Sequence, residues 1–498
     1  MQAPRTETAT FSASFRGALL AVLALVFAVI SIRAALGRSA WYDEYYTFYV
    51  SRPAQPFGAF WASAMRDNHP PLYYLLARAA TWLGETIPPR RLVNLAFAAL
   101  AALALWRIGR RRPALKPVLF AYAVGLAGAS PVIVRMAELR SNFLAYALGA
   151  VTVAALAAFA VPHERMSRRA TVALAATLAL SFTVHLAATV ILAAVAASFG
   201  LRLILARDWP GTARLALVGL VAALPFALCM AAQFGTISGN TRSFWIPGGF
   251  TVARWTIEME LIAGVKANPV LTVAGLAGLV LTGWRDLASR RLSPGLSLAL
   301  TLGAGLALAI AALVAIHLER PFVIARYLIC LHPVVLMILA LGVATLAESL
   351  GRLVHAALDC ALVIAALVSL QGQLQRTLAL PGWDTSAAAI DSDVRACPAT
   401  AVHAALDWNR AVLDLPPAEN RAVVPFAYDF VAARHGFALE PPASRRMASG
   451  CPTLFWAEHV PGSLPDTATI AARLRQLGYP VSHGELARQG DGWIFTAR

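Results

Sequence analysis

Residues 15–46 read FRGALLAVLALVFAVISIRAALGRSAWYDEYY, an apolar run that ends in aromatic and acidic residues. Its apolar part, Ala18 to Leu36, is about as long as a helix needs to cross a hydrocarbon core of ~30 Å. Similar runs recur along the first three quarters of the chain, which is 59% hydrophobic and only 14% charged. A soluble domain usually has about 25% charged residues. Because backbone in lipid must satisfy its own hydrogen bonds, these runs are predicted to be membrane-spanning helices.

The net charge of +16 comes largely from short basic clusters between the apolar runs. No basic domain or nucleic-acid motif accompanies them, so no nucleic-acid partner is expected. Cytoplasmic loops of membrane proteins are enriched in Lys and Arg, which explains such clusters. If residues 1–14 form a cytoplasmic N-terminus, the cluster from Arg107 to Lys116 faces the cytoplasm only when residues 38–90 form one long outer loop. Within that loop, residues 71–84 are expected to form an interfacial or re-entrant helix.

The same charge rule orders the rest of the membrane domain, residues 15–371. Every dense basic cluster falls on the cytoplasmic side if the chain crosses the cell inner (cytoplasmic) membrane about eleven times. A twelfth or thirteenth crossing stays open, because the apolar stretch 170–205 is hard to divide. The predicted spans are 15–37, 91–109, 114–130, 143–161, 170–184, 186–205, 215–234, 268–284, 295–316, 327–347 and 352–371.

Beyond residue 371 the composition becomes that of a soluble domain, with Asp, Glu, Pro and scattered aromatic residues. Residues 372–498 are therefore predicted to form a small α/β domain. With a cytoplasmic N-terminus and eleven crossings, this domain is expected on the outer side of the membrane. Its strand-like runs are Arg421 to Phe426, Thr453 to Ala457 and Gly492 to Thr496, and its helix-like run is Thr467 to Leu477.

The cysteines divide between the two domains. Cys397 and Cys451 lie in the C-terminal domain, and each precedes a proline. In an oxidising compartment they would form a disulfide, with two unpaired thiols as the alternative. Cys229, Cys330 and Cys360 fall within predicted spans and are expected to be packing residues.

The first predicted outer loop contains two polar strings. Tyr42, Asp43 and Glu44 follow the first span directly, and acids flanked by aromatics are unusual there because partial desolvation disfavours charged carboxylates. A solvated loop within an aromatic belt is the alternative interpretation. The second string, NHPPLYY, contains His69 and Tyr73, and its prolines pre-set the start of a helix behind the histidine.

Arginines mark the next outer segments. Glu138 and Arg140 lie in one, and Arg320, Arg326 and Tyr327 precede a late span. Arginine pairs bidentately with phosphate, although an arginine at a membrane boundary also snorkels. Carboxylates, arginines and aromatics on one face suit a ligand that bears both phosphate and sugar. A further outer loop, 235–267, is expected to be a flexible flap with Asn240, Arg242, Trp245 and a Pro-Gly-Gly turn at 247–249.

The order of these motifs resembles that of the C-type (GT-C) glycosyltransferases of the protein O-mannosyltransferase and aminoarabinose-transferase kind. Asp43-Glu44 and the string from His69 to Tyr74 match the family in content and spacing, and the resemblance covers roughly residues 15–350. Such proteins commonly have E-A-R-P-Y, whereas Asn142 stands here at the tyrosine position after Glu138 and Arg140. The C-terminal domain resembles the family only in its position.

The resemblance implies an inverting transferase that moves a sugar from a polyprenyl-phosphate donor to an acceptor hydroxyl at the outer face. Asp43 would be the general base, and no second acid is needed because polyprenyl phosphate leaves as a stable anion. Arg140 with Arg320 or Arg326 would neutralise that phosphate. Glu44, the second acid of the catalytic motif, and His69 would orient the base or bind the acceptor. The other expected substrate-binding residues are Tyr42, Tyr73, Glu138 and Tyr327.

Several alternatives stay open at this level. No cofactor is certain, but Asp43, Glu44 and His69 would hold a divalent metal ion if the protein binds one. The acceptor class is open between a glycan, a lipid and a protein. The competing function is a transporter or flippase of lipid-linked sugars, which would favour charges inside the membrane and internal repeats. No repeat is found, and His332 and Asp359 are interpreted as satisfied helix contacts.

Overall fold

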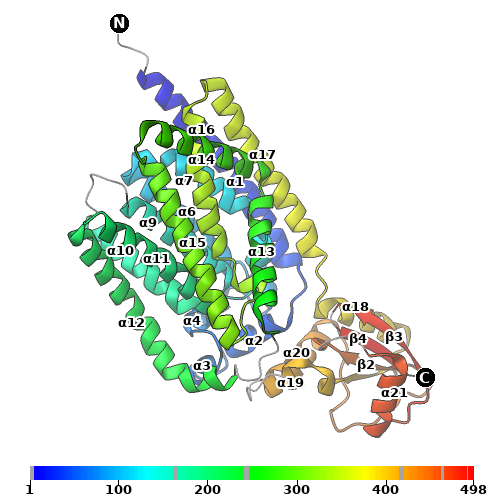
Figure 1. Ribbon diagram of the computed structural model, residues 1–498. Coiled ribbons are helices and arrows are strands. Elements are labelled where there is room, and N and C mark those ends of the chain that lie inside the picture. Colours follow the sequence, from blue (N-terminus) through cyan, green and yellow to red (C-terminus); the bar gives the residue numbers. More distant parts are fainter. Residues whose placement is uncertain are drawn as a thin grey trace.

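The computed structural model describes residues 5–160, 167–240, 246–413, 420–460, 465–490 and 492–497. A bundle of long helices is joined to a small α/β domain (Figure 1). Within these ranges, nine helical segments are long and apolar enough to cross a membrane. The prediction of a polytopic helical membrane domain is confirmed. The nine segments contain α1 (Arg5–Gly37), α6 (Val93–Arg111), α9 (Asn142–Phe159), α11 (Leu186–Leu205), α12 (Trp209–Asn240), α14 (Pro269–Ser289), α15 (Pro294–Glu319), α16 (Leu331–Glu348) and α17 (Arg352–Leu378).

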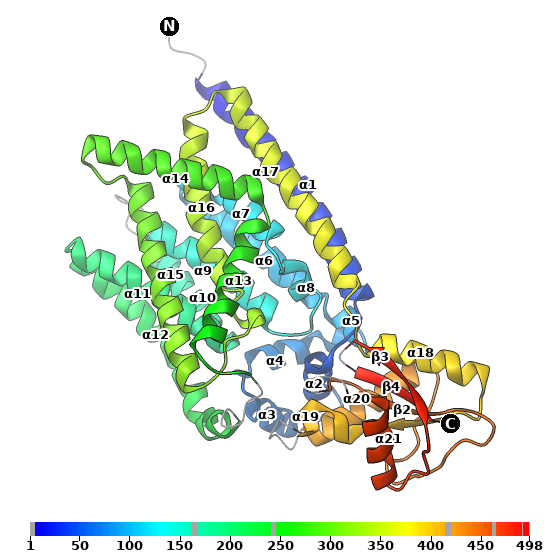
Figure 2. The same cartoon turned by 45° about the vertical axis from the view of Figure 1, so that its right-hand side comes forward.

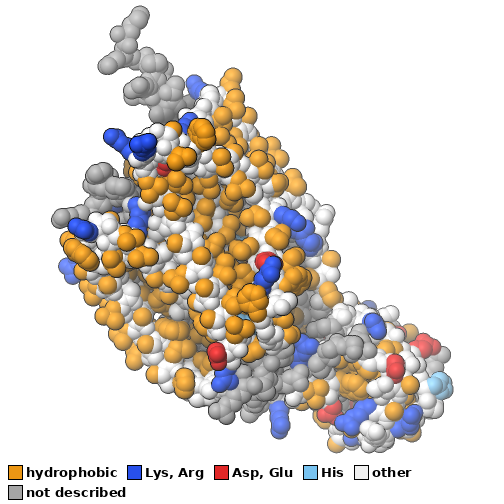
Figure 3. Space-filling view, viewed as in Figure 1, with side chains coloured by type: hydrophobic (Ala, Val, Ile, Leu, Met, Phe, Trp, Pro, Cys, Tyr) orange, Lys and Arg blue, Asp and Glu red, His pale blue; other side chains and the backbone are white. Residues whose placement is uncertain are grey.

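The outer surface of this bundle suits a lipid environment. Hydrophobic side chains cover most of the visible face of the helices (Figure 3). Leu220 of α12, Val280 of α14 and Val368 of α17 are each about 70% exposed (71%, 73% and 68%). In water such a continuous apolar surface would drive association, so it is the expected surface of a membrane domain.

Two of the eleven predicted spans form shorter helices. α7 (Lys116–Gly128) has 13 residues and α10 (Arg168–Val184) has 17. At 1.5 Å per residue, α7 covers only about 20 Å of a ~30 Å hydrocarbon core. α7 packs in the bundle against α16 and α17, and α10 packs against α12. The number of eleven crossings therefore stays a prediction.

Glycines allow the closest helix pairs to form. A Cβ atom on Gly278 of α14 would overlap the backbone of Gly342 on α16, and one on Gly342 would overlap Gly275. On α15, a Cβ at Gly305 would lie 2.9 Å from the Cα of Val195 on α11. Small residues let helix backbones approach closely in a membrane, where packing replaces the hydrophobic driving force. These glycines therefore set the spacing of the bundle.

The predicted long outer loop is largely helical. Between α1 and α6 it contains α2 (Tyr42–Val50), α3 (Phe57–Met65), α4 (Leu72–Ala79), the 3₁₀ turn η1 (Ala80–Leu83) and α5 (Ile87–Arg90). The predicted helix at 71–84 is present as α4 and η1, and Pro70 and Pro71 precede its first residue. Three short segments complete the elements of the membrane domain: η2 (Pro113–Leu115), α8 (Val132–Met136) and η3 (Ala325–Tyr327).

The interpretation of residues 235–267 as a flexible flap is wrong. α12 continues to Asn240, and α13 (Phe250–Lys266) occupies most of the remainder. Glu258 and Arg254 form an i,i+4 ion pair on the exposed face of α13, while Ile257 and Glu260 are buried. The charged residues of this segment therefore follow a helical period. Arg242 and Trp245 lie outside the described residues.

The C-terminal domain has a mixed four-stranded sheet in the order β1-β2-β4-β3. β1 (Ala401–Ala404) is parallel to β2 (Thr453–Ala457), and β4 (Gly492–Ala497) runs antiparallel to both β2 and β3 (Gly484–Gln489). The predicted small α/β domain is confirmed, with β2 and β4 at the predicted places. Its helical elements are α18 (Trp383–Ala396), η4 (Leu406–Trp408), α19 (Arg410–Leu413), α20 (Asn420–Arg434) and α21 (Thr467–Gln476).

The prediction of a strand from Arg421 to Phe426 is wrong, because these residues belong to α20. The buried side chains of this segment follow a helical spacing, and they include Val424, Tyr428 and Val431. Short apolar runs cannot be divided between strand and helix by composition alone. β1 and β3 were not predicted, since β1 has four residues and β3 is mostly exposed.

The two domains share an apolar interface. α1 and α17 lie side by side and lead towards the soluble domain (Figure 2). Phe48 of α2 lies 5.0 Å from Phe430 of α20, and Tyr45 lies 5.1 Å from Trp383, measured between ring centroids. The backbone N–H of Trp383 also donates to the carbonyl of Ala40. Aromatic pairs at such distances stabilise an interface beyond the area they bury. α2, an element of the membrane domain, is therefore also fixed by contacts with the C-terminal domain.

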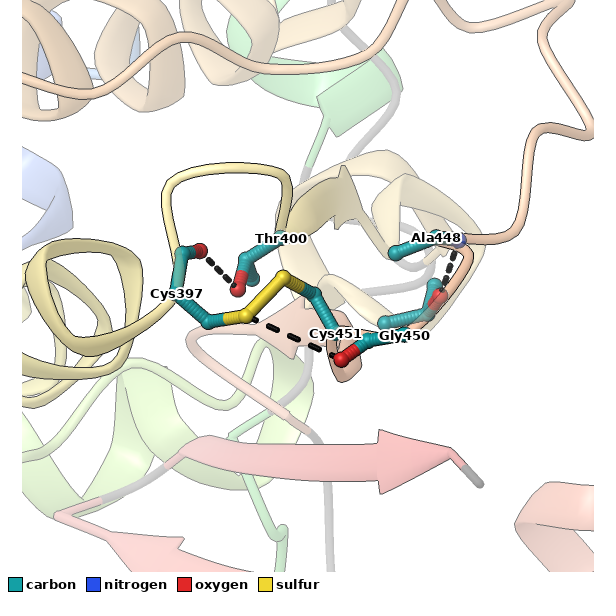
Figure 4. The surroundings of a disulfide bond; sticks show 6 residues. Cys397, Thr400, Ala448, Gly450 and Cys451 are labelled. Atoms are coloured by element: carbon teal, nitrogen blue, oxygen red, sulfur yellow. Dashed lines mark hydrogen bonds between the residues drawn. A yellow bond between two sulfur atoms is a disulfide. The ribbon is translucent and has the colours of Figure 1, made fainter.

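Cys397 and Cys451 form a disulfide, with their Cα atoms 5.8 Å apart (Figure 4). The predicted pairing is confirmed. It joins the end of α18 to the segment before β2. Cys330 is buried and unpaired, and Cys229 and Cys360 are half-buried and unpaired, as expected for packing residues.

Replacing both disulfide cysteines, in C397S/C451S, is expected to destabilise the C-terminal domain by about 2–4 kcal/mol, because the bond closes a long loop in the unfolded chain. The thermal unfolding midpoint of the purified protein measures this, with C360S as the matched control. Wild-type protein from cells should also migrate faster on a non-reducing gel than after reduction. A midpoint unchanged in the double variant, or no mobility difference, would contradict the prediction.

Candidate active site

The start of α2 directs its two acids to opposite surroundings. Glu44 has no exposed side-chain surface, and both of its carboxylate oxygens accept from Arg91, from Nε at 2.7 Å and Nη2 at 2.8 Å. The backbone N–H of Leu139 donates a third bond to Glu44 at 2.7 Å. Arg91 also donates to the carbonyls of Ala35 and Arg38. Glu44 therefore connects α2 to three other segments of the chain and does not face the site.

Glu138 is held in a similar way. Its carboxylate lies 2.9 Å from Arg135 and 3.2 Å from Arg38, and Asn142 donates to its second oxygen at 3.2 Å. Burial raises the pKa of Glu138, but the charges of Arg135 and Arg38 lower it by more. The pKa of Glu138 therefore lies below its usual value. Asn142, which replaces a tyrosine of the family pattern, thus contributes a hydrogen bond inside the protein. Glu138 positions the segment that leads to Arg140.

Asp43 faces away from this buried network, and its side chain remains 19% exposed. Its carboxylate lies 3.4 Å from Arg326 and 3.9 Å from Arg140. Burial raises the pKa of Asp43, but Arg326, Arg140 and His459 together lower it below its ordinary value. Asp43 is therefore an ionised carboxylate between two guanidinium groups. This is the arrangement that a base beside an anionic leaving group requires.

Arg140 organises the residues around Asp43. One of its amino groups donates to the Thr47 hydroxyl at 3.1 Å and to the Tyr74 hydroxyl at 3.3 Å. The Tyr74 hydroxyl in turn donates a short hydrogen bond to Asp67. Burial raises the pKa of Asp67 above its usual value, despite the opposing influence of Arg140. Two carboxylates near one arginine thus have pKa values displaced in opposite directions.

The ring of His69 packs against two other rings beside this cluster. Its ring centroid lies 5.6 Å from Tyr327 and 5.2 Å from His185, and His185 lies 4.9 Å from Tyr327. Burial, and then the charge of Arg140, lower the pKa of His69 to about 3. The imidazole is therefore neutral at physiological pH. Its Nδ1 is buried and has no hydrogen-bond partner among the described residues, so it keeps an unused hydrogen-bonding capacity.

The remaining expected residues are placed differently. Tyr42 is buried and stacks on His459 of the C-terminal domain, with ring centroids 5.1 Å apart and planes 11° apart. Tyr73 is also buried, and its hydroxyl has no partner among the described residues. Arg326 lies over the Trp41 ring at 5.0 Å. Arg320 is exposed at the end of α15 and forms no ion pair with the described residues, so Arg326 is the arginine that joins Arg140.

The residues proposed for a metal ion do not come together. Glu44 directs both carboxylate oxygens to Arg91, and Asp43 faces arginines. In the described part of the chain, no three His, Cys, Asp or Glu side chains gather as metal ligands would. No step of the chemistry is therefore assigned to a metal here.

Two cavities lie outside this cluster. The larger, about 490 Å³, is lined by apolar residues of α14, α16 and α17, such as Val273 and Leu346, and has no polar group for catalysis. The smaller, about 210 Å³, lies in the C-terminal domain. The cluster around Asp43 is therefore chosen by its charges and distances rather than by cavity size.

Comparison with known proteins rests on structure. No protein-family model matches the sequence, and no curated protein matches it. ArnT from Cupriavidus metallidurans in the apo state aligns over 97% of this chain and 98% of its own, with 14% identity and a TM-score of 0.58. The fold is that of ArnT. The C-type glycosyltransferase fold predicted from the motifs is therefore confirmed.

The same ArnT bound to undecaprenyl phosphate aligns over 96% of this chain and 98% of its own, with 14% identity and a TM-score of 0.55. An Archaeoglobus fulgidus oligosaccharyltransferase in complex with Zn and sulfate covers 88% of this chain and 68% of its own, with 13% identity and a TM-score of 0.42. At identities this low, structural similarity shows the fold alone. The chemistry must be argued from the residues of this chain.

Sequence reasoning missed several residues of the cluster. Asp67 precedes the quoted string by one residue, and its closeness to His69 was a usable signal. Arg91 lies at the start of a predicted span, where snorkelling is the default interpretation. His185 falls between two apolar runs. His459 follows Asp43 by more than four hundred residues and had no sequence signal.

The variant R91M is expected to lower stability strongly, because it leaves the Glu44 carboxylate buried without a counter-charge. Breaking one side of a buried ion pair costs about 3–5 kcal/mol. The thermal unfolding midpoint in detergent measures the loss. R254M, which breaks the exposed pair with Glu258, is the matched control and should leave the midpoint unchanged. Similar midpoints for both variants would show that the buried pair does not hold α2.

Proposed function

We propose that this protein is an inverting glycosyltransferase that moves a sugar from a polyprenyl-phosphate donor to an acceptor hydroxyl at the outer face of the cytoplasmic membrane. The single observation that supports this most is the Asp43 carboxylate, partly exposed, between Arg326 and Arg140. The ArnT fold supports the same reaction class, since ArnT has been seen with undecaprenyl phosphate. Catalysis needs a base and a cationic site for the departing phosphate, and this cluster contains both.

In the proposed reaction, Asp43 accepts the proton of the acceptor hydroxyl as its oxygen attacks the anomeric carbon. The bond between that carbon and the phosphate oxygen breaks, and Arg326 and Arg140 stabilise the negative charge of the departing polyprenyl phosphate. No carboxylic acid has to protonate this leaving group. One displacement from the face opposite the phosphate inverts the anomeric configuration.

The same arginines tune the base. Without donor, they lower the pKa of Asp43, which keeps the carboxylate ionised but weakens it as a base. A bound phosphate would offset part of the arginines' positive charge. Its own negative charge would also disfavour a second negative charge on the nearby carboxylate. The pKa of Asp43 then rises towards its ordinary value, and its basicity increases when the donor is present.

The surrounding residues take supporting roles in this proposal. Glu44 positions α2 through Arg91 and does not react. His69, neutral and with an Nδ1 that has no partner among the described residues, and Tyr327 bind hydroxyl groups or the apolar face of the sugar. The disulfide of the C-terminal domain supports an oxidising, outer location for that domain.

A transporter of lipid-linked sugars has less support. Two polar sites inside the bundle are contacts between helices: Asp359 lies 2.7 Å from Arg16, and His332 lies 3.0 Å from Glu260. The partly exposed cluster of charges lies at α2 instead. A transport pathway would place polar groups near the middle of the membrane.

The variant D43N is expected to abolish sugar transfer from a polyprenyl-phosphate donor, because the amide cannot accept the hydroxyl proton. Loss of general-base catalysis alone costs roughly 10²–10⁴-fold. Transfer of radiolabelled sugar in membranes measures it, with folded protein quantified in the same samples. D393N, at an exposed aspartate of α18, is the matched control and should keep full activity. Transfer at the wild-type rate in D43N would remove Asp43 as the base.

The variant R326Q is expected to shift the acidic limb of the kcat/KM profile to higher pH. Arg326 is the strongest of the groups that lower the pKa of Asp43, so its removal raises that pKa and the base protonates at higher pH. The rate at the optimum should also fall by roughly 10²–10³-fold, because one donor to the leaving phosphate is lost. R320Q, at the exposed arginine nearby, should keep the wild-type profile. Equal effects of both substitutions would contradict the assignment.

A further inference from the structure

The cavity of about 210 Å³ in the C-terminal domain has a mixed aromatic and acidic lining. Pockets for drug-sized ligands are usually roughly 300–1,000 Å³, so this one suits a smaller group. The residues that matter for its chemistry are His403, Asp407, Trp408, Asp429, Phe455 and Tyr479. They come from β1, η4, α20, β2 and the segment after α21. None of them belongs to the cluster around Asp43.

One side of this cavity is a rigid set of rings. His403 stacks on Phe455 with ring centroids 5.1 Å apart, and Tyr479 meets them edge-on at 5.0 Å and 4.8 Å. His403 Nε2 lies 2.8 Å from the carbonyl of Arg446, and the Tyr479 hydroxyl donates to Ser444. The rings therefore keep their orientation without a ligand. The three rings are largely buried and form a rigid apolar floor, against which the C–H face of a sugar ring can pack.

The other side supplies free hydrogen-bond acceptors. Asp407 and Asp429 are exposed, and neither forms an ion pair or side-chain hydrogen bond with the described residues. Trp408 adds an indole N–H that has no partner among the described residues. Carboxylates accept from several hydroxyl groups at once and repel anions.

Arg445 and Glu440 also line the cavity. Arg445 donates to the carbonyls of Leu477, Pro442 and Ser444, and Glu440 pairs with Arg446. Among the described residues, the unpaired charges of the lining are thus the two aspartates, which favour a neutral, hydroxylated ring over a phosphate or another acid.

A short backbone path connects the cavity to Asp43. Two residues after Trp408, the N–H of Arg410 donates to the carbonyl of His459 at 2.8 Å. Asn409 also donates to Glu458 at 2.9 Å, which fixes the segment before His459. The His459 ring stacks on Tyr42, the residue before Asp43. His459 has a left-handed φ of 53°, a backbone conformation that the bonds to the carbonyls of Glu458 and His459 stabilise.

We propose that this cavity binds a neutral sugar unit of the acceptor, and that His459 transmits its position to the Asp43 site. The inference rests on the proposed function and narrows the acceptor to a glycan. A sugar held beside η4 places the rest of the acceptor chain towards Tyr42 and Asp43. The C-terminal domain then selects the acceptor, while the membrane domain binds the donor.

The test measures sugar binding separately from transfer. A panel of methyl hexosides and methyl pentosides is added to the full-length protein in detergent, and saturation-transfer NMR reports binding. The double variant D407N/D429N changes only exposed side chains, so its fold is expected to survive, and H483A at an exposed loop is the matched control. We expect saturable binding of at least one glycoside by the wild type, D43N and H483A, and at least tenfold weaker binding by D407N/D429N.

A transfer assay with a glycan acceptor adds a second readout. D407N/D429N should raise the KM for the acceptor at least tenfold and leave kcat within about twofold. H459N should alter the same KM without changing the binding of methyl glycosides. Unchanged glycoside binding in D407N/D429N, or preferential binding of a peptide or phosphate probe at the cavity, would overturn the proposal. If the wild type binds glycosides but transfers no sugar, the proposed function fails while the cavity assignment stands.

Discussion

The buried ion pair between Glu44 and Arg91 is the interaction on which the candidate site depends. Neither side chain has exposed surface, so every charge and donor must be satisfied by protein groups. Arg91 achieves this with Glu44 and two carbonyls at the end of α1, and Glu44 adds the N–H of Leu139. One pair thus joins the end of α1, α2, the residues between α5 and α6, and the segment before Arg140. Because Glu44 points inward, its neighbour Asp43 must point towards the site.

This geometry explains how one set of arginines can serve both parts of the proposed reaction. Arg326 and Arg140 come from distant segments, and both reach the Asp43 carboxylate. They keep Asp43 ionised without substrate and are in place to receive a departing phosphate. Their positive charge is shared between base and phosphate, so donor binding and base strength are coupled. In the proposed reaction, such a site favours catalysis only when the donor is bound.

The C-terminal domain contributes to the same site. Aromatic contacts between α2 and α20 make the domain interface a continuation of the protein core, and His459 stacks on Tyr42, the residue before Asp43. A domain attached only by a linker would not hold a ring in this position. The disulfide and the sheet keep the segments around the small cavity in order. Acceptor selection and catalysis can therefore be separated between domains yet remain in contact.

The sequence alone determined the membrane class, the α/β nature of the last domain and the strings that contain Asp43, His69, Arg140 and Arg326, because composition, period and local spacing are visible in a linear chain. For Cys397 and Cys451 it left a disulfide and two free thiols open, and the structure decided for the disulfide. Only the tertiary structure decided which of the adjacent acids is buried, and that Arg326 rather than Arg320 reaches the site. Neighbouring residues on a helix point in different directions, and His459 meets Tyr42 only after folding. Such choices depend on packing between distant segments, which local sequence does not record.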